Sequence, residues 1–442
     1  MRRRFPVPPS QLPALEPLLD GGLWSSWAER GWVFPLDDLP AAVRYVRLKP
    51  HTSCRLLVFG NDASAGLDPP PGFVLQLYPD RERARLAFDK ISNRKQFIGP
   101  LGYEPFIREE HAVVAVPFPN DSEVPGLRHV YRRHRLRQAL TEILDDRPPE
   151  LWTVEKRRIR LGLLAYKPGR RAVYRVDVPI TERASSKCVF HTFHMKVENR
   201  GTCERSYRNL VAIHGAVPPG ACWSVPAPRG RVESRSMIVT EWVDGQPLAS
   251  RIDDPGRARQ VFRATGRALG ELHAVEAGLR PLPASGDRLS DLSMDLARML
   301  PDDARAIETL GERLSRAGAH DRDRTATTVH GDFHLDQVLL VGDRPVLVDF
   351  DRAGLGDGLD DIGSFCARLE EERVDPVLAR DFLEGHAEAS GCKPESQQIR
   401  IATAVALFYR CGFPFRSLDP NWPEAIRQRM TRIDRLLDGD TP

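Results

Sequence analysis

The sequence predicts an α+β protein with two lobes, because strand-like segments dominate its first part and helix-like segments its second. The helical character begins near Pro255, where the apolar residues Val261, Ala268 and Leu272 recur at the spacing of a packed helix. Only one short strand-like interruption, 338–350, follows. The strand-like runs of the first part are 43–48, 56–59, 73–77, 161–165, 172–178 and 189–197.

Length and charge exclude several classes of protein. The chain has 442 residues, more than the roughly 100–200 residues of one domain, so we expect two or three domains. Its net charge of only +3 argues against a dedicated nucleic-acid binder. No run approaches the roughly 20 apolar residues of a membrane span, and prolines follow the basic start where a signal peptide would need apolar residues. We expect no nucleic-acid or membrane partner, and the oligomeric state stays open.

Cysteine and lysine usage add two expectations. Seven cysteines are scattered without a Cys-x-x-Cys pair, which indicates reduced thiols and a cytoplasmic protein. Only eight of the 64 Lys and Arg residues are lysines. A lysine within an apolar strand-like segment is therefore a candidate for a specific role, and Lys196, in Phe193-His194-Met195-Lys196-Val197, is such a residue.

Proline- and glycine-rich clusters divide the chain at 68–72, 147–149 and 217–220. We predict an extra α/β region over 1–150, a β-rich lobe over 151–245 and a helical lobe over 246–442. The first two parts share an order of elements: Lys49-Pro50 and Lys167-Pro168 each end a first strand, and Gln76 then falls where Lys196 falls. The recurrence is either a duplicated module or the common likeness of two hairpins that precede a helix.

The densest chemical signal lies between Val329 and Asp351. Gly342-Asp343 is a good tight-turn pair between two apolar runs, so 338–341 and 345–350 should form a hairpin. Pairing the runs across this turn places Gln337 opposite Asp349, with Cβ atoms ~5 Å apart. Asp332, on the loop that enters the first strand, should lie near the same end.

Two carboxylates and an amide oxygen at one loop edge have no packing purpose. Carboxylates this close repel each other unless a cation or a general-base role explains them. Oxygen ligands of this kind suit Mg²⁺, which commonly takes one or two protein groups together with substrate phosphates. The alternative is an acidic turn that only caps the local backbone.

The pattern His330-Gly331-Asp332-x-His334-x-x-Gln337, followed by Asp349-Phe350-Asp351, resembles the catalytic and metal loops of the aminoglycoside phosphotransferase and choline kinase-like superfamily. These are small-molecule kinases with a protein-kinase-like, two-lobed fold. The resemblance implies that Asp332 is the catalytic base and that Gln337 and Asp349 hold Mg²⁺. Asn is usual where Gln337 stands, and Gln is similar to the maltokinase-like branch. The resemblance covers roughly 155–440.

The same resemblance implies the other parts of an ATP site. Lys196 would grip the α- and β-phosphates. Its implied ion-pair partner is Glu204, although Glu198 is a competitor nearer in sequence. Asp361, in the segment Gly356–Ile362, would support the catalytic loop. The remaining implied nucleotide contacts are Gly169 in the loop over the nucleotide, Thr240, Glu241 and Trp242 at the adenine hinge, and Leu339 beneath the adenine ring.

Three other sites are rejected. His330 and His334 are four residues apart, but Gly331 spoils the helix that a zinc pair at this spacing requires. Gly354-Leu355-Gly356-Asp357-Gly358 lacks the spacing of a dinucleotide-binding turn. The chain has no Gly-x-x-x-x-Gly-Lys-Ser/Thr segment, which excludes a Walker A loop.

These observations predict an ATP- and Mg²⁺-dependent kinase that phosphorylates a hydroxyl of a small molecule, a sugar or amino sugar on resemblance. A second hypothesis is a kinase-like protein that binds nucleotide without turnover. A third is a metal-dependent phosphohydrolase, which would leave Lys196 and the hinge unexplained.

Overall fold

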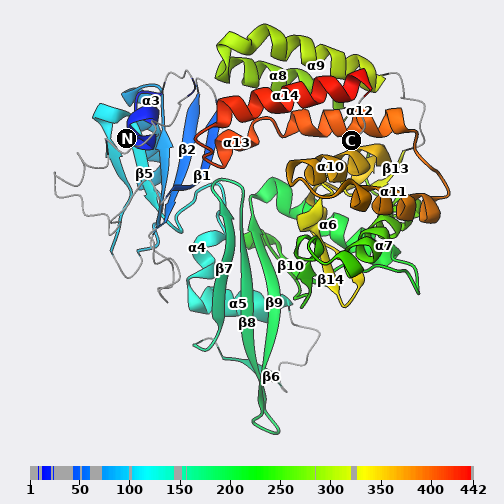
Figure 1. The fold of residues 1–442 in the computed structure, drawn as a ribbon. Coiled ribbons are helices and arrows are strands. Elements are labelled where there is room, and N and C mark those ends of the chain that lie inside the picture. The colour runs from blue at the N-terminus through cyan, green and yellow to red at the C-terminus, as the bar shows by residue number, and fades with distance from the viewer. Residues whose placement is uncertain are drawn as a thin grey trace.

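The computed structural model describes residues 12–20, 43–49, 52–59, 72–98, 102–143, 152–155, 157–283, 285–319 and 326–439, together with Pro8 and Leu23. The basic start and most of the proline-rich clusters at 68–72 and 147–149 lie outside the described residues. Two antiparallel sheets occupy the first part of the chain and helices dominate the second, which confirms the α+β fold class (Figure 1).

The first sheet follows the short helix α1 (Leu15–Leu19) and has the strand order β1-β2-β3-β5-β4. Helix α3 (Arg81–Ser92) connects its third strand to its fourth and begins at Asp80, whose side chain accepts a hydrogen bond from the amide of Arg83. Its strands are β1 (Val43–Lys49), β2 (Ser53–Phe59), β3 (Gly72–Leu77), β4 (Phe106–Arg108) and β5 (Val113–Pro117).

The second sheet has the order β10-β11-β9-β8-β6, and β7 also pairs with β8. Helix α6 (Arg200–Ala216) connects β9 to β10 and begins at the N-cap Asn199. The strands are β6 (Trp152–Val154), β7 (Arg160–Lys167), β8 (Arg171–Glu182), β9 (Cys188–Glu198), β10 (Pro228–Val232) and β11 (Met237–Glu241).

The two sheets share one topology. In each, a hairpin of two strands is followed by a third strand, a helix and two more strands, and the last strand inserts beside the third. In each, a single 3₁₀ turn precedes the last strand and ends on a left-handed residue, Ala112 in the first sheet and Ser236 in the second. The strand registers place Gln76 opposite Val114 and Lys196 opposite Ile238. This correspondence favours the duplicated-module interpretation, with Gln76 in the place of Lys196.

The helical part surrounds a small hairpin of β14 (Val338–Val341) and β15 (Arg344–Leu347). The short strand β12 (Gln246–Pro247) extends this hairpin, and β13 (Thr327–Val329) pairs with β16 (Gly354–Gly356). The helices are α7 (Pro255–Ala274), α8 (Ser285–Met299), α9 (Ala304–Ala319), α10 (Gly358–Glu371), α11 (Pro376–Ser390), α12 (Ser396–Tyr409), α13 (Phe413–Arg416) and α14 (Trp422–Asp438). Within the described residues, no helix combines the length and apolar character that crossing a bilayer requires.

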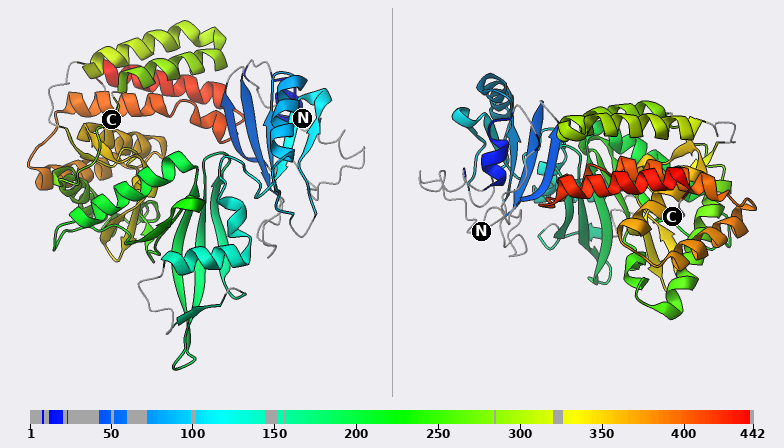
Figure 2. Two further views of the ribbon diagram at one scale, coloured as in Figure 1. Left: turned by 180° about the vertical axis from the view of Figure 1, so that it is seen from behind. Right: turned by 45° about the horizontal axis from the view of Figure 1, so that its top comes forward.

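The first sheet packs against both other parts of the molecule. Along β2, Leu56 belongs to a buried apolar cluster shared with the helices α12 to α14, while its neighbour Leu57 belongs to a cluster shared with the second sheet. Strand β1 also contacts α13, and Figures 1 and 2 show the first sheet beside α13 and α14 in each view. Alternation along a strand therefore directs its two faces into two different cores.

Helices α4 (Leu127–Val130) and α5 (Arg133–Ile143) pack on the second sheet rather than on the first. Their buried residues Val130, Leu136 and Leu140 share a core with Tyr174 and Met195 of that sheet. The chain thus passes from the first sheet to the second near residue 118. The boundaries at 150 and 245 stay predictions.

Candidate active site

The predicted hairpin is present, but its register differs from the expected one by one residue. Val338 pairs with Leu347, and the amide of Val348 donates to the carbonyl of Gln337 at 3.0 Å. Gln337 therefore faces Val348 instead of Asp349. Asp349 follows the hairpin in a left-handed conformation, with φ of 67°, which turns the chain out of the ladder.

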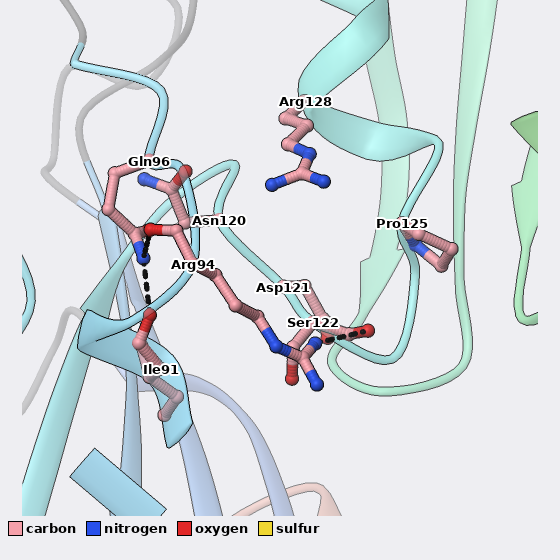
Figure 3. Close-up of a pocket in the computed structure, with 8 residues that line it drawn as sticks. All are labelled: Ile91, Arg94, Gln96, Asn120, Asp121, Ser122, Pro125 and Arg128. Atoms are coloured by element: carbon pink, nitrogen blue, oxygen red, sulfur yellow. Dashed lines mark hydrogen bonds between the residues drawn. The ribbon is translucent and has the colours of Figure 1, made fainter. Parts of the chain in front are cut away.

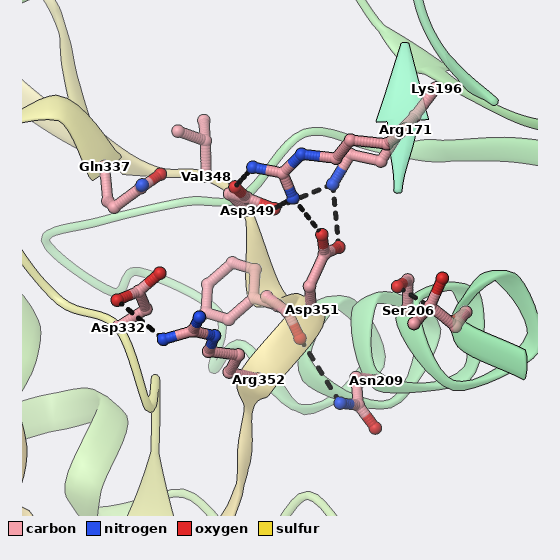
Figure 4. A network of polar contacts seen from close by, with 12 residues as sticks. Arg171, Lys196, Ser206, Asn209, Asp332, Gln337, Val348, Asp349, Asp351 and Arg352 are labelled. Carbon is pink, nitrogen blue, oxygen red and sulfur yellow. Dashed lines mark hydrogen bonds and ion pairs between the residues drawn. The ribbon is translucent and has the colours of Figure 1, made fainter. Parts of the chain in front are cut away.

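Two carboxylates of this segment meet two cations of the second sheet (Figure 4). The Lys196 Nζ atom of β9 lies 2.7 Å from Asp349 Oδ1 and 2.7 Å from Asp351 Oδ1. Arg171, the first residue of β8, donates to Asp349 Oδ2 at 3.0 Å and also pairs with Asp351. The two lobes are therefore joined at this point by a network of four charged side chains.

Burial and charge shift the pKa values in this network. Burial raises the pKa of Asp349, but the Lys196 and Arg171 charges outweigh it and hold that pKa well below its usual range. Burial lowers the pKa of Lys196, but Asp349, Asp351 and Glu198 outweigh it and raise the pKa above its usual value. Both groups are therefore charged at neutral pH.

Glu204 is not the partner of Lys196, which corrects that prediction. Glu204 is exposed on α6, whose buried face presents Cys203, Ser206 and Asn209. The buried acid beside Lys196 is Glu198, which is 2% exposed and whose pKa burial and Asp351 raise to about 7. Residues 196 and 198 share one face of β9 because strand side chains alternate, and this period could have identified Glu198 from the sequence.

Helix α6 contributes an amide instead of a carboxylate. The side chain of Asn209 donates to the backbone carbonyls of Phe350 at 3.2 Å and Ala353 at 2.9 Å. These bonds attach the helix to the segment that carries Asp349 and Asp351. Helix α6 therefore positions the two carboxylates through their backbone.

The buried side chain of Asp361 binds the backbone of the loop that carries Asp332. The Asp361 carboxylate accepts hydrogen bonds from the amides of His330 at 2.6 Å and Gly331 at 2.8 Å. Burial raises the pKa of Asp361, but His273, His330 and the backbone amide outweigh it and lower the pKa. Gly331 has φ of +77°, and a Cβ atom there would lie 2.3 Å from the carbonyl oxygen of Arg352. The supporting contact expected for Asp361 is thus present.

Replacing Asp361 by Asn should destabilise the protein by about 3 kcal/mol, because an amide NH₂ would face one of the two backbone N–H donors. Thermal unfolding measures the effect. Asp375→Asn is the matched control, since Asp375 is an exposed N-cap of α11 and Asn caps helices equally well. Equal melting temperatures for the two variants would show that Asp361 does not support the loop.

Asp332 lies next to Arg352, and Gln337 next to His334. Arg352 Nη1 is 3.2 Å from Asp332 Oδ1, and both side chains are partly exposed. The Gln337 amide nitrogen is 3.2 Å from His334 Nε2. In Figure 4 the Gln337 side chain extends toward Asp349, and the Asp332 carboxylate lies beneath it in the view. Asp332 and Gln337 thus have separate polar neighbours, Arg352 and His334, and their base and metal roles stay predictions.

The expected adenine hinge is the end of β11. Thr240 is buried and its hydroxyl lies 3.3 Å from His194 Nδ1, while the Glu241 amide donates to the carbonyl of Ala227. Trp242 stacks under the Arg175 guanidinium at 5.1 Å. Leu339 adjoins the following segment, since a Cβ atom on Gly245 would lie 3.1 Å from its Cβ. The structure thus brings Leu339 against Gly245, three residues after Trp242, and the nucleotide contacts of these residues stay predictions.

Oxygen donors for a divalent cation are available at Asp349, Asp351 and Gln337. The two carboxylates contact the same Nζ atom, so their oxygens lie within one cation's reach. This donor set fits Mg²⁺. In the described part of the chain, no group of three or more His, Cys, Asp or Glu side chains forms a metal cluster by itself. A cation at this position would have to displace Arg171 from the carboxylates.

The sequence did not single out Arg171 and Asp351, although they complete the network. Arg171 lies two residues after Gly169, and the direction of a side chain this close to a turn cannot be predicted from the sequence. Asp351 is two residues after Asp349, and the 3₁₀ turn of Phe350–Arg352 brings both carboxylates to one side. Only the contact between β8 of one lobe and the Phe350–Arg352 turn of the other reveals their roles.

Comparison with known proteins supports the resemblance seen in the sequence. Residues 188–394, just under half of the chain, match the sequence profile described as the phosphotransferase enzyme family (APH). This match confirms the superfamily over these residues, and the likeness to the maltokinase-like branch stays a prediction. No curated protein sequence matches the chain significantly.

Several solved structures resemble the chain loosely. A choline/ethanolamine kinase family protein from Mesorhizobium loti is 16% identical, with a TM-score of 0.45, and the match covers 63% of this chain and 88% of that one. Amicoumacin kinase hAmiN, solved with AMP-PNP, Ca²⁺ and Ami, is 14% identical with a TM-score of 0.44, over 69% and 96% of the chains. A thermostable mutant of aminoglycoside phosphotransferase APH(4)-Ia, solved with ADP and hygromycin B, is 13% identical with a TM-score of 0.44, and the match covers 69% of this chain and 98% of that one. At these TM-scores the likeness is too loose to place any residue.

Proposed function

From the premise that residues 188–394 match the phosphotransferase enzyme family, we propose that this protein is an ATP- and Mg²⁺-dependent kinase. It phosphorylates a hydroxyl group of a small molecule, a sugar or amino sugar. The single observation that supports this most directly is the contact between Lys196 Nζ and Asp349 Oδ1 at 2.7 Å. A phosphate-binding amine from one lobe and a metal-binding carboxylate from the other must meet if they are to hold one nucleotide.

The residues divide the work of phosphoryl transfer among them. Lys196 binds the α- and β-phosphates, and Asp349, Asp351 and Gln337 would hold Mg²⁺. The bound cation would neutralise charge on the β- and γ-phosphates. Asp332 accepts the proton of the acceptor hydroxyl and orients it for attack in line with the leaving group. Asp361 keeps the Asp332 loop in place through two backbone amides.

The surroundings of Asp332 favour an acceptor without high positive charge. Arg368 pairs with Asp336 at 3.4 Å and also with Glu372. Arg410 pairs with Glu371 at 2.6 Å. These carboxylates are already neutralised and leave little free negative charge for several ammonium groups. A neutral sugar therefore fits this side of the site better than a polyamine sugar does.

A substrate panel tests the proposal. The purified protein is incubated with ATP, Mg²⁺ and a set of neutral sugars, amino sugars and aminoglycosides, and the products are identified by mass spectrometry. We expect a mass gain of one phosphoryl group on a sugar, and loss of the reaction when EDTA removes the metal. ATP cleavage that needs no acceptor, and that survives Lys196→Met, would favour the phosphohydrolase instead.

The position of Arg171 supports a second candidate function, nucleotide binding without turnover. Arg171 pairs with both Asp349 and Asp351, where it competes with a cation. A protein in which Arg171 never leaves would bind nucleotide without turnover. Thermal stabilisation by ATP that is unaffected by Mg²⁺, with no product from the panel, would identify this nucleotide-binding protein. We propose a cytoplasmic location for either function, on the scattered cysteines, all seven of which are free thiols.

A further inference from the structure

The turn between β7 and β8 is held by residues that precede the second sheet. Asp121 Oδ2 accepts hydrogen bonds from the amide of Gly169 at 2.6 Å and from the hydroxyl of Tyr166 at 2.9 Å. The Arg170 guanidinium lies close to Tyr45 of β1, which acts to raise its pKa against the lowering by burial. The Tyr166 ring is buried against Phe118, with ring centroids 5.0 Å apart. Three of the turn's residues therefore contact the first sheet or the chain that leaves it.

Asp121 is itself held rigidly. Its second oxygen, Oδ1, accepts from the amide of Glu123 at 2.9 Å. The adjacent Asn120 exchanges two hydrogen bonds with the backbone of Phe97, at 2.7 and 3.0 Å. Further along, Gly126 approaches the second sheet so closely that a Cβ atom would lie 1.9 Å from the carbonyl oxygen of Arg235. Figure 3 shows this segment leading to α4, with Asp121 and Ser122 at its bend. These contacts fix the position of the Asp121 carboxylate independently of its hydrogen bonds to the turn.

Gly169 allows the close approach. Its φ of +72° is a conformation that side chains disfavour, and a Cβ atom would lie 1.8 Å from Nη1 of Arg55. Arg55 belongs to β2 of the first sheet and forms a bidentate pair with Glu123. The turn therefore fits against an ion pair of the first sheet only because residue 169 has no side chain.

The turn directs its cations toward the catalytic groups. Arg171, at its end, pairs with Asp349 and Asp351. Lys167 is near Asp349 and Asp332, since both carboxylates act to raise its pKa against the lowering by desolvation and by the neighbouring arginines. The turn thus presents positive charge where Asp332 and Asp349 come together. A misplaced turn would move this charge away from a transferred phosphate.

We propose that Asp121 is a positioning residue that holds the turn of residues 166–171 over the nucleotide phosphates. On this view the first sheet, which has Gln76 where the second has Lys196, supports the phosphate-binding turn of the second sheet and does not form a second nucleotide site. The inference rests on the proposed function for the position of the nucleotide. The contacts between Asp121 and the turn do not depend on it.

Asp121→Ala tests the proposal with two independent measurements. Amide hydrogen exchange of the protein without nucleotide should accelerate at least tenfold at Gly169, because its hydrogen-bond acceptor is lost. The KM for ATP should rise about tenfold, whereas the KM for the acceptor should stay within twofold. If Asp121 only stabilises the fold, Asp121→Ala would lower the melting temperature and the active fraction. The KM for ATP would then not rise relative to the KM for the acceptor.

Two further variants serve as comparisons. Tyr166→Phe removes one bond to Asp121 and keeps the ring, so its KM for ATP should rise about threefold. Asp80→Ala is the matched control, because Asp80 also accepts a hydrogen bond from a backbone amide, that of Arg83 at 2.8 Å, but at the start of α3, away from the turn. Its exchange at Gly169 and its KM for ATP should match those of the wild type.

The outcomes separate this inference from the proposed function. Unchanged exchange at Gly169 in Asp121→Ala would overturn the support role, whatever the activity. Faster exchange with an unchanged KM for ATP would show that the turn does not position phosphates, which also overturns the proposal. If the wild type phosphorylates nothing, ATP affinity measured by calorimetry replaces KM. A tenfold loss of that affinity in Asp121→Ala would still support the inference while the kinase proposal fails.

Discussion

Asp332→Asn should lower kcat by about 10³-fold and leave ATP affinity unchanged, because an amide cannot accept the proton of the acceptor hydroxyl. The substitution preserves the shape of the side chain, and the carbonyl oxygen of Asn can still accept a hydrogen bond from Arg352. The loop should keep its conformation, since its backbone is held by Asp361. Steady-state rates with the acceptor from the panel, together with calorimetric ATP titration, measure both quantities.

Asp336→Asn is the control for that substitution. Asp336 lies four residues further along the same loop, is exposed, and pairs with Arg368 instead of Arg352. Its kcat should stay within about threefold of the wild type, since exposed pairs contribute little. Turnover by Asp332→Asn at the level of Asp336→Asn would remove Asp332 from the base role.

Lys196→Met should weaken ATP binding by about 100-fold and lower kcat further, because the buried amine that contacts the phosphates is gone. The same change removes one of the two cations that pair with Asp349 and Asp351, and leaves the buried Glu198 with less compensating charge. The variant should therefore also lose about 3 kcal/mol of unfolding free energy. Calorimetric ATP titration and chemical denaturation separate the two effects.

Two lysine variants complete this test. Lys187→Met changes an exposed lysine next to the start of strand β9 and should affect neither ATP affinity nor stability. Lys196→Arg keeps the charge and should recover most of the stability, but its planar guanidinium should not restore the ATP affinity. Wild-type ATP affinity in a folded Lys196→Met protein would refute the phosphate-binding role.

The hairpin and its chemistry could be predicted because local signals agree there. The Gly342-Asp343 turn, the two apolar runs and the acid and amide at their ends all lie within a short stretch of chain. The register was still displaced by one residue. The apolar run from Pro345 to Phe350 continues past the last ladder pair, and nothing in it shows that Asp349 adopts a left-handed conformation.

The partner of Lys196 shows how a family expectation can mislead. A helix after β9 was expected to carry the carboxylate, yet α6 turns Ser206 and Asn209 inward and leaves Glu204 exposed. The sequence offered Glu198 only as a competitor nearer to Lys196, although the strand period puts both residues on one face of β9. For the acid beside Lys196, the alternation of side chains along β9 is a better guide than the helix position that the family resemblance implies.

The role of the first 150 residues could not be predicted, because the contacts that define it are long-range. Asp121 and Gly169 are 48 residues apart in the chain. The sequence offers no periodicity or turn signal that links them. The shared order of strands was visible in the sequence as Lys49-Pro50 and Lys167-Pro168, but a shared order does not reveal which surface of the first copy supports the second.

The opposite faces of β2 have a mechanical consequence. Leu56 contributes to the core around α12 to α14, and Leu57 to the core of the second sheet. Besides the chain that follows Glu241 and the polar network around Lys196, the first sheet therefore links the two lobes by buried apolar surface on both of its faces. Moving the lobes apart would expose apolar area on at least one of these faces. Entry and exit of a nucleotide should therefore depend on local movement of the β7–β8 turn more than on wide hinge opening.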